Sequence, residues 1–108
     1  MRKGVIVLIP FPFTDLSGQK VRPAVVLHDE KKGEDCIVAF ISSNRDGKTG
    51  FYEIPIRPSR GNGIKVDSLI KVSKIATLQK KIILGELGIV EDLILDKINS
   101  SLKKLFNI

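Results

Sequence analysis

The sequence predicts a mostly β protein, a small and strongly bent barrel of five to seven short antiparallel strands with one C-terminal helix. Short apolar runs rich in β-branched residues recur along most of the chain, and Gly, Pro or charged segments separate them. Only residues 91–108 show the spacing of a helix. Since the chain has 108 residues, 43% of them hydrophobic, we expect one core and a single domain over residues 1–108.

Three continuous apolar runs are typical of buried strands, namely residues 5–9, 24–27 and 36–41. The charged segment 29–35 joins the second run to the third and predicts the turn of a hairpin, in which Gly33 is free to take a positive φ. We therefore expect the second and third strands to pair antiparallel.

The next segment, residues 51–56, alternates and so places Tyr52, Ile54 and Ile56 on one face of a fourth strand. Pro55 has no N–H to donate to a neighbouring strand, so this strand is expected at a sheet edge or to end early. Weaker patterns predict three further elements: a strand at 68–72, a helical turn near 78–82 and a strand near 85–87.

The terminal segment reads as an amphipathic helix that starts near Glu91. Acidic residues stand in its first turn and lysines in its last turn, as the helix dipole favours. The last three residues, Phe106-Asn-Ile108, are expected to fray. The apolar stripe consists of Ile94, Leu95, Ile98, Leu102 and Leu105.

The net charge of +6 is unevenly distributed, because the charges of residues 91–108 cancel. The span 43–65 carries five basic residues against two acidic ones. A basic face favours a polyanionic partner, nucleic acid first, although ordinary solubilising charge is the alternative. The single cysteine, Cys36, lies inside an apolar run, which indicates a small buried residue and fits a reducing cytoplasm.

Two polar residues stand at strand ends that the predicted hairpin brings together. Arg22 opens the second strand beside Pro23, and Ser42 leaves the third strand. Antiparallel pairing puts both at the same end of the sheet. A guanidinium grips phosphate with two donors and a hydroxyl supplies another, so the pair predicts a phosphate pocket. A surface arginine and a turn-forming serine are the ordinary alternatives.

Other candidates for chemistry are weaker. His28 ends the second strand about six residues from Arg22, roughly 20 Å away, so we do not expect it to act as general base. No cysteine pair, histidine cluster or carboxylate group has metal-ligand spacing, so no metal or cofactor is predicted. Four aromatic rings could stack on bases, namely Phe11, Phe13, Phe51 and Tyr52. The alternation of residues 51–56 favours a core position for Tyr52.

Three stretches resemble the MazF/PemK family of toxin endoribonucleases, in particular its PemK-type branch: residues 9–18 with Arg22-Pro-Ala-Val-Val26, residues 37–42 and residues 66–78. The resemblance implies an SH3-like barrel of the MazF/CcdB type that forms a homodimer. It also implies metal-independent cleavage of single-stranded RNA, often mRNA, at short sequence motifs. A cognate antitoxin would block the groove, and DNA binding would involve that antitoxin.

The resemblance further implies attack by the RNA 2′-hydroxyl on the adjacent phosphorus, which gives a 2′,3′-cyclic phosphate and a 5′-hydroxyl. Arg22 would neutralise charge on the phosphorus oxygens, and Ser42 would donate a hydrogen bond to one of them. The chain departs from many members at Val5, where they have an acidic residue, and from some at Ala76, where they have Arg. Further RNA contacts are expected from Phe11, Phe13, Thr14, Lys20, Ser43, Asn44, Arg45, Lys48, Arg57 and Arg60.

Two other functions stay open. One is a toxin of the CcdB type that inhibits DNA gyrase, whose Trp-Gly-Ile terminus is faintly similar to Phe106-Asn-Ile108. The other is an RNA-binding barrel without catalytic activity.

Overall fold

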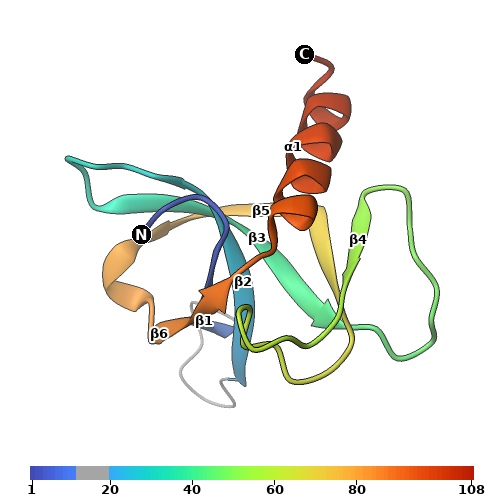
Figure 1. Cartoon of the computed structure of the whole chain (residues 1–108). Helices are drawn as coiled ribbons and strands as arrows, with labels where there is room; N and C mark the ends of the chain where they lie inside the picture. The colour runs from blue at the N-terminus through green and yellow to red at the C-terminus, as the bar shows by residue number, and fades with distance from the viewer. Residues whose placement is uncertain (12–19) are drawn as a thin grey trace.

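The computed structural model describes residues 1–11 and 20–108, which form one curled antiparallel sheet and one helix (Figure 1). The prediction of a mostly β chain with a C-terminal helix is confirmed. In chain order the elements are β1 (Val5–Phe11), β2 (Lys20–Asp29), β3 (Asp35–Ser43), β4 (Glu53–Ile56), β5 (Ser68–Gln79), η1 (Lys80–Ile82), β6 (Gly85–Ile89) and α1 (Asp92–Phe106).

The strands lie in the order β4-β5-β3-β2-β1-β6. The predicted hairpin is confirmed, because β2 and β3 pair antiparallel, from Ala24 opposite Phe40 to Asp29 opposite Cys36. Strand β4 carries Pro55 and lies at an edge, as expected. The pairing of β5 with β3, and of β6 with β1, joins segments that are far apart in the sequence.

Strand β5 is longer than the sequence predicts, and a break in its pairing bends it. Ala39 of β3 lies opposite Ile75, whereas the next residue, Phe40, lies opposite Lys71. Residues 72–74 of β5 therefore have no counterparts on β3, and such an insertion kinks a strand and increases its twist. Before the break β5 pairs with both β3 and β4, and after it only with β3, so the sheet curls into a half-barrel.

The loop after β4 covers the edge strand β6 on the other side of the barrel. The N–H of Ile89 donates to the carbonyl of Gly61, at 2.9 Å. Gly88 permits this approach, because a Cβ there would lie 2.2 Å from the same carbonyl oxygen. Gly63 is required as well, since its φ is +70° and a Cβ would lie 2.4 Å from the carbonyl oxygen of Leu87. The two glycines thus let the loop close the gap between the sheet edges.

Alternate residues of the strands pack on the two faces of the sheet. One core cluster packs under α1 and holds Ile6, Val25, Ala39, Ile41, Ile54, Ile56, Ile64, Ile70, Val72, Val90 and Ile98. The other lies on the opposite face and holds Val5, Val7, Ile9, Ala24, Val26, Cys36, Val38 and Leu78. Tyr52 packs against the first cluster together with Ile54 and Ile56, so the alternation predicted for this segment is confirmed.

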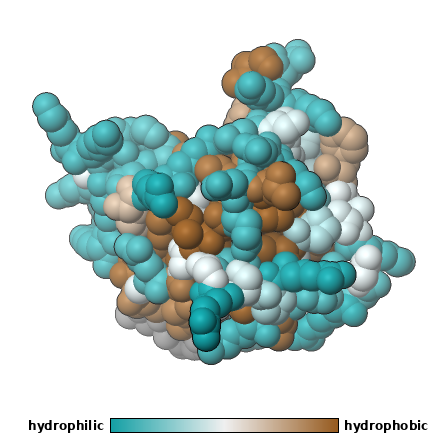
Figure 2. Space-filling view, viewed as in Figure 1, coloured by the Kyte–Doolittle hydropathy of each residue, from teal (hydrophilic) through white to brown (hydrophobic). Residues whose placement is uncertain are grey.

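Helix α1 follows the predicted stripe, with Ile98 fully buried and the other stripe residues packed on the first cluster. Figure 2 shows hydrophobic side chains gathered below the helix, at the centre of a face whose rim is mostly hydrophilic. Its C-terminus differs from the prediction of a frayed end. Asn107 adopts a left-handed conformation with φ 57°, and the N–H of Ile108 donates to the carbonyl of Lys103 at 3.0 Å. The helix therefore ends in a capped turn.

Of two predicted turns, one forms as expected and the other closes differently. The helical turn expected near 78–82 is the 3₁₀ turn η1. Gly33 was expected to be free to take a positive φ, but the described glycines with positive φ are Gly4, Gly47 and Gly63. The 29–35 turn closes instead through a hydrogen bond from the Gly33 N–H to the carbonyl of Glu30, at 3.2 Å.

Within residues 1–11 and 20–108, no helix is long and apolar enough to cross a membrane.

Candidate functional site

Arg22 and Ser42 lie on one face of the sheet, where β2 begins and β3 ends. Ala24 pairs with Phe40, and continuing this register by two residues puts Arg22 opposite Ser42. Directly opposed residues of antiparallel strands share a face, so both side chains belong to the face of the second core cluster. Both residues line one cavity of about 550 Å³.

This cavity, called here the cationic cavity, has five basic residues and no carboxylate in its lining. Four of the five have no ion-pair partner among the described residues, so their charge is available to a ligand. Such a concentration of one sign attracts anions and holds phosphate groups. The lining consists of Lys20, Arg22, Phe40, Ile41, Ser42, Ser43, Arg45, Lys71 and Lys74.

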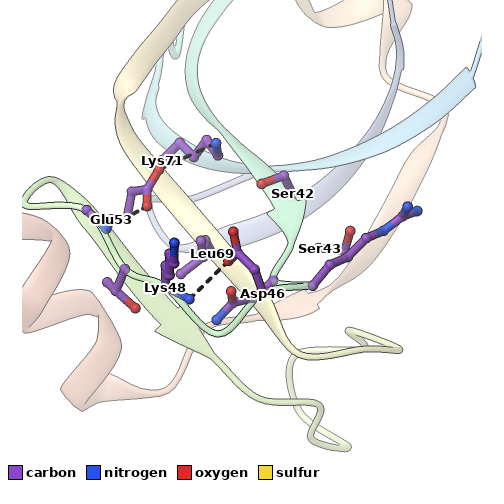
Figure 3. Close-up of a pocket in the computed structure, with 11 residues that line it drawn as sticks. Ser42, Ser43, Asp46, Lys48, Glu53, Leu69 and Lys71 are labelled. Carbon is purple, nitrogen blue, oxygen red and sulfur yellow. Dashed lines mark hydrogen bonds and ion pairs between the residues drawn. The ribbon is translucent and has the colours of Figure 1, made fainter.

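A second cavity of about 450 Å³, shown in Figure 3, shares part of its lining with the first. It is called here the mixed cavity, because carboxylates, an amide and hydroxyls line it together with cations. Ser42, Ser43, Arg45 and Lys71 line both cavities, which therefore form one groove. The remaining lining residues of the mixed cavity are Asn44, Asp46, Lys48, Thr49, Gly50, Glu53 and Leu69.

Lys71 lines both cavities, and an ion pair with a residue of β4 fixes its position. It lies opposite Glu53 in the β4–β5 pair, and its Nζ is 3.4 Å from Glu53 Oε2. Glu53 Oε1 accepts the N–H of Gly50 at 2.7 Å. One carboxylate thus fixes both the lysine and the end of the loop that forms the mixed cavity.

Lys71 and Lys74 were not among the site residues predicted from the sequence. The only signal for Lys71 was its polar position in a weakly alternating strand, and that signal does not say which strand lies beside it. Lys74 lies in the unmatched segment of β5, which no local pattern announces. Both reach the cationic cavity because β5 pairs with β3.

The predicted RNA-binding residues separate into three groups. Lys20, Ser43, Asn44, Arg45 and Lys48 line the groove. Arg57 and Arg60 line neither cavity. The predictions for the Phe11 side chain, Phe13 and Thr14 fall outside the described residues.

Asn62 shows why the loop with Arg57 and Arg60 lies elsewhere, since it ties that loop to the start of α1. The fully buried Asn62 donates from Nδ2 to the carbonyl of Arg57, at 2.8 Å, and also to the carboxylate of Glu91. Ser59 Oγ donates to the same carboxylate at 2.9 Å. Partial burial acts to raise the pKa of Glu91, but its own backbone N–H and the bonds from Ser59 and Asn62 outweigh it and lower the pKa.

The remaining candidates do not line the groove. Phe51 is 79% exposed at the β4–α1 side, with its ring edge-on to Tyr52 and 5.9 Å from Lys104 Nζ. His28 is at the far end of β2, where its Nε2 lies 3.3 Å from Glu30 Oε1. Cys36 is buried, and burial raises the pKa of its thiol. In the part of the chain that the structure describes, no three His, Cys, Asp or Glu side chains gather as around a metal ion.

Comparison with known proteins agrees with this architecture. Residues 2–106 match the family model of PemK-like, MazF-like toxins of type II toxin–antitoxin systems. No protein of curated function matches the sequence. The fold is that of an endoribonuclease from a mycobacterial species, solved in complex with its cognate antitoxin. That structure has a TM-score of 0.78 and 18% identity, with 100% of this chain and 96% of the other covered.

Two further solved structures share the fold. MazE–MazF from Deinococcus radiodurans has a TM-score of 0.78 and 18% identity, with 100% and 97% of the two chains covered. The Mycobacterium tuberculosis toxin MazF-mt6 has a TM-score of 0.75 and 17% identity, with 99% and 98% covered. Since the family model spans nearly the whole sequence, this chain belongs to the PemK-like, MazF-like toxins of type II toxin–antitoxin systems.

Proposed function

We propose that this chain is a sequence-selective endoribonuclease that cleaves single-stranded RNA, and that the groove holds its substrate. The observation that carries the proposal is the meeting of Arg22 and Ser42 in a cavity with five basic residues and no carboxylate. Family membership supports it, and so does the fold that the chain shares with solved endoribonucleases.

The reaction begins with attack of an RNA 2′-oxygen on the adjacent phosphorus. The bond from phosphorus to the 5′-oxygen of the next nucleotide breaks, and a 2′,3′-cyclic phosphate and a 5′-hydroxyl result. One proton leaves the 2′-hydroxyl and one reaches the departing 5′-oxygen. DNA lacks the nucleophile and is not cut.

The chain's own side chains stabilise charge during this step. Arg22 binds the phosphate through two N–H donors, and Ser42 donates its hydroxyl to a phosphorus oxygen. Lys71 lies beside them and adds a third donor, oriented by Glu53. Donors fixed in advance are each worth about 3 kcal/mol in the transition state. A guanidinium is a hydrogen-bond donor with no acceptor atom, so the role of Arg22 is electrostatic and Arg22 does not act as the base.

Cleavage of a fluorescent single-stranded RNA by variants tests the proposal. Arg22→Ala should lower the rate at least about 100-fold, and Ser42→Ala should have a comparable effect. Arg2→Ala is the matched control, because Arg2 is exposed and lines neither cavity. Cleavage by Arg22→Ala at the wild-type rate would remove the proposed site, and an inactive wild type would favour the non-catalytic barrel.

The products and the metal requirement give a second check. The upstream fragment should carry a cyclic phosphate, and the downstream fragment should accept a phosphate from polynucleotide kinase without prior treatment. A single 2′-deoxy substitution at the cut position should stop cleavage. As the family resemblance implies a metal-independent reaction, activity should persist in excess EDTA.

We also propose a cognate antitoxin and a homodimer for this chain. Similar MazF-fold proteins are solved with their antitoxins. A groove with this excess of basic residues favours an acidic antitoxin segment. Sedimentation of the purified chain tests the dimer, and competition between antitoxin and RNA tests whether the two share the groove.

A further inference from the structure

The two halves of the groove differ in charge, although they share four residues. The cationic cavity carries no carboxylate, whereas the mixed cavity adds Asp46 and Glu53. Three basic residues accompany the two carboxylates of the mixed cavity, against five basic residues and no carboxylate in the cationic cavity. Carboxylates repel phosphate, so the sugar-phosphate backbone is favoured in the cationic cavity. A base, which is uncharged and presents N–H donors, suits the mixed cavity.

Asp46 is the carboxylate in the mixed cavity that remains open to a ligand. Both oxygens of Glu53 are engaged, one by the Gly50 N–H and the other by Lys71. Asp46 Oδ1 accepts the N–H of Lys48 at 3.0 Å, which fixes the side chain. Its other oxygen has no partner among the described residues. Figure 3 shows the Asp46 side chain directed into the space between Ser42 and Lys48.

A carboxylate in this position selects bases by their hydrogen-bond donors. Guanine alone presents two donors on adjacent atoms of its Watson–Crick edge, N1–H and the N2 amino group, with the O6 acceptor beside them. Arg45 precedes Asp46 in the same lining and can donate to O6. Adenine and cytosine place an acceptor next to their amino group, and uracil has only one donor on this edge. Each of these bases can therefore donate only one hydrogen bond to the carboxylate, whereas guanine can donate two.

We propose that the mixed cavity is a base subsite that selects guanine next to the scissile phosphate, with Asp46 as the specificity-determining residue. This inference rests on the proposed RNA substrate. It assigns the cationic cavity to the phosphate and the Asp46 carboxylate to the N1–H and N2 amino donors of the neighbouring base. Glu53 orients Lys71 and does not touch the base.

Binding of RNA that cannot be cut tests the subsite apart from catalysis. The probes are two short, fully 2′-O-methylated, uridine-rich RNAs that differ at one position, guanosine in one and inosine in the other. Inosine keeps O6 and N1–H but lacks the N2 amino group. Wild type should bind the guanosine RNA about 10-fold more tightly, since a good bidentate pair discriminates against the wrong base by about 5- to 150-fold.

Asp46→Asn is the informative variant. Its amide oxygen can still accept the N–H of Lys48, whereas an NH₂ group, which is a donor, replaces the second carboxylate oxygen. It should reduce the guanosine preference to less than about 2-fold. Asp35→Asn is the matched control, since Asp35 is an exposed aspartate at the other end of β3 that lines neither cavity, and it should keep the preference.

Equal binding of the two RNAs by wild type, or a preference that survives in Asp46→Asn, would overturn the subsite. Both results can be read whether or not the protein cleaves RNA, so failure of the nuclease proposal stays distinguishable. If the enzyme cuts a random RNA pool, the sequenced ends should be enriched in guanine at one position beside the cut. The same position should lose that enrichment in Asp46→Asn.

Discussion

Replacing Asn62 by Ala should destabilise the protein by about 3 kcal/mol, because one buried amide satisfies several backbone groups of the loop that closes the barrel. Its Oδ1 accepts the N–H of Ser59 at 3.0 Å and the N–H of Ile64 at 2.8 Å. Its Nδ2 donates to the carbonyl of Arg57 at 2.8 Å. Alanine can make none of these three bonds.

The magnitude depends on which of the three groups can find water instead. The bond to the Ile64 N–H is buried, so that donor loses its partner at a cost of about 1–3 kcal/mol. The groups of Ser59 and Arg57 are only partly buried and can be hydrated, at about 0.5 kcal/mol each. The sum lies near 3 kcal/mol. Loss of the donor to Glu91 adds little, because Ser59 Oγ still donates to that carboxylate.

Urea unfolding followed by circular dichroism measures this loss. With a slope of about 1.5 kcal/mol per molar urea, the midpoint should fall by about 2 M. Asn99→Ala is the matched control, since the buried Oδ1 of Asn99 has no partner among the described residues and its removal should cost almost nothing. Equal midpoints for the two variants, or a loss below about 1 kcal/mol for Asn62→Ala, would refute the role given to Asn62.

Two further predictions concern acid stability and the limits of the groove. The hydrogen bonds from Lys80, and secondly from the α-amino group of Met1, lower the pKa of Asp29 below its ordinary 3.8. The unfolded chain then binds this proton more readily, so the stabilisation is complete above that value and is lost as the pH falls through the folded-state pKa. The urea midpoints of wild type and Asp29→Asn should therefore differ at about pH 6 and converge near pH 2, whereas a constant difference would contradict this linkage. Lys74→Ala should weaken RNA binding and reduce its salt dependence by about one ion, but Arg57→Ala should change neither, as measured by fluorescence anisotropy at several salt concentrations.

The hairpin and the cavity it forms were predictable because both depend on local signals. Each apolar run is continuous and rich in β-branched residues, and the charged segment 29–35 is short enough to bring β2 and β3 together. Once that pair is given, antiparallel geometry places the start of β2 beside the end of β3. Arg22 and Ser42 thus come to line one cavity for a reason that the sequence already contains.

The residues predicted to bind RNA do not all line the groove. The prediction treated the basic span 43–65 as one surface, but the two halves of that span lie in different places. Ser43, Asn44, Arg45 and Lys48 line the groove. Arg57 and Arg60 belong to a loop that Asn62 ties to Glu91. The composition of such a span predicts its charge. It does not predict the hydrogen bonds of Asn62, which hold the loop with Arg57 and Arg60 outside the groove.

The amino-acid order by itself determined the strands, the terminal helix and the meeting of Arg22 with Ser42, since these follow from periodicity and a short turn. Only the tertiary structure decided that β5 lies beside β3 and that Lys71, together with Lys74 of the unmatched segment, reaches the cationic cavity. It also decided that Asp46 rather than Glu53 stays open to a ligand. The physical reason is the distance along the chain. A strand's alternation specifies which side chains share a face, but the partner that covers this face is chosen by the packing of the whole barrel.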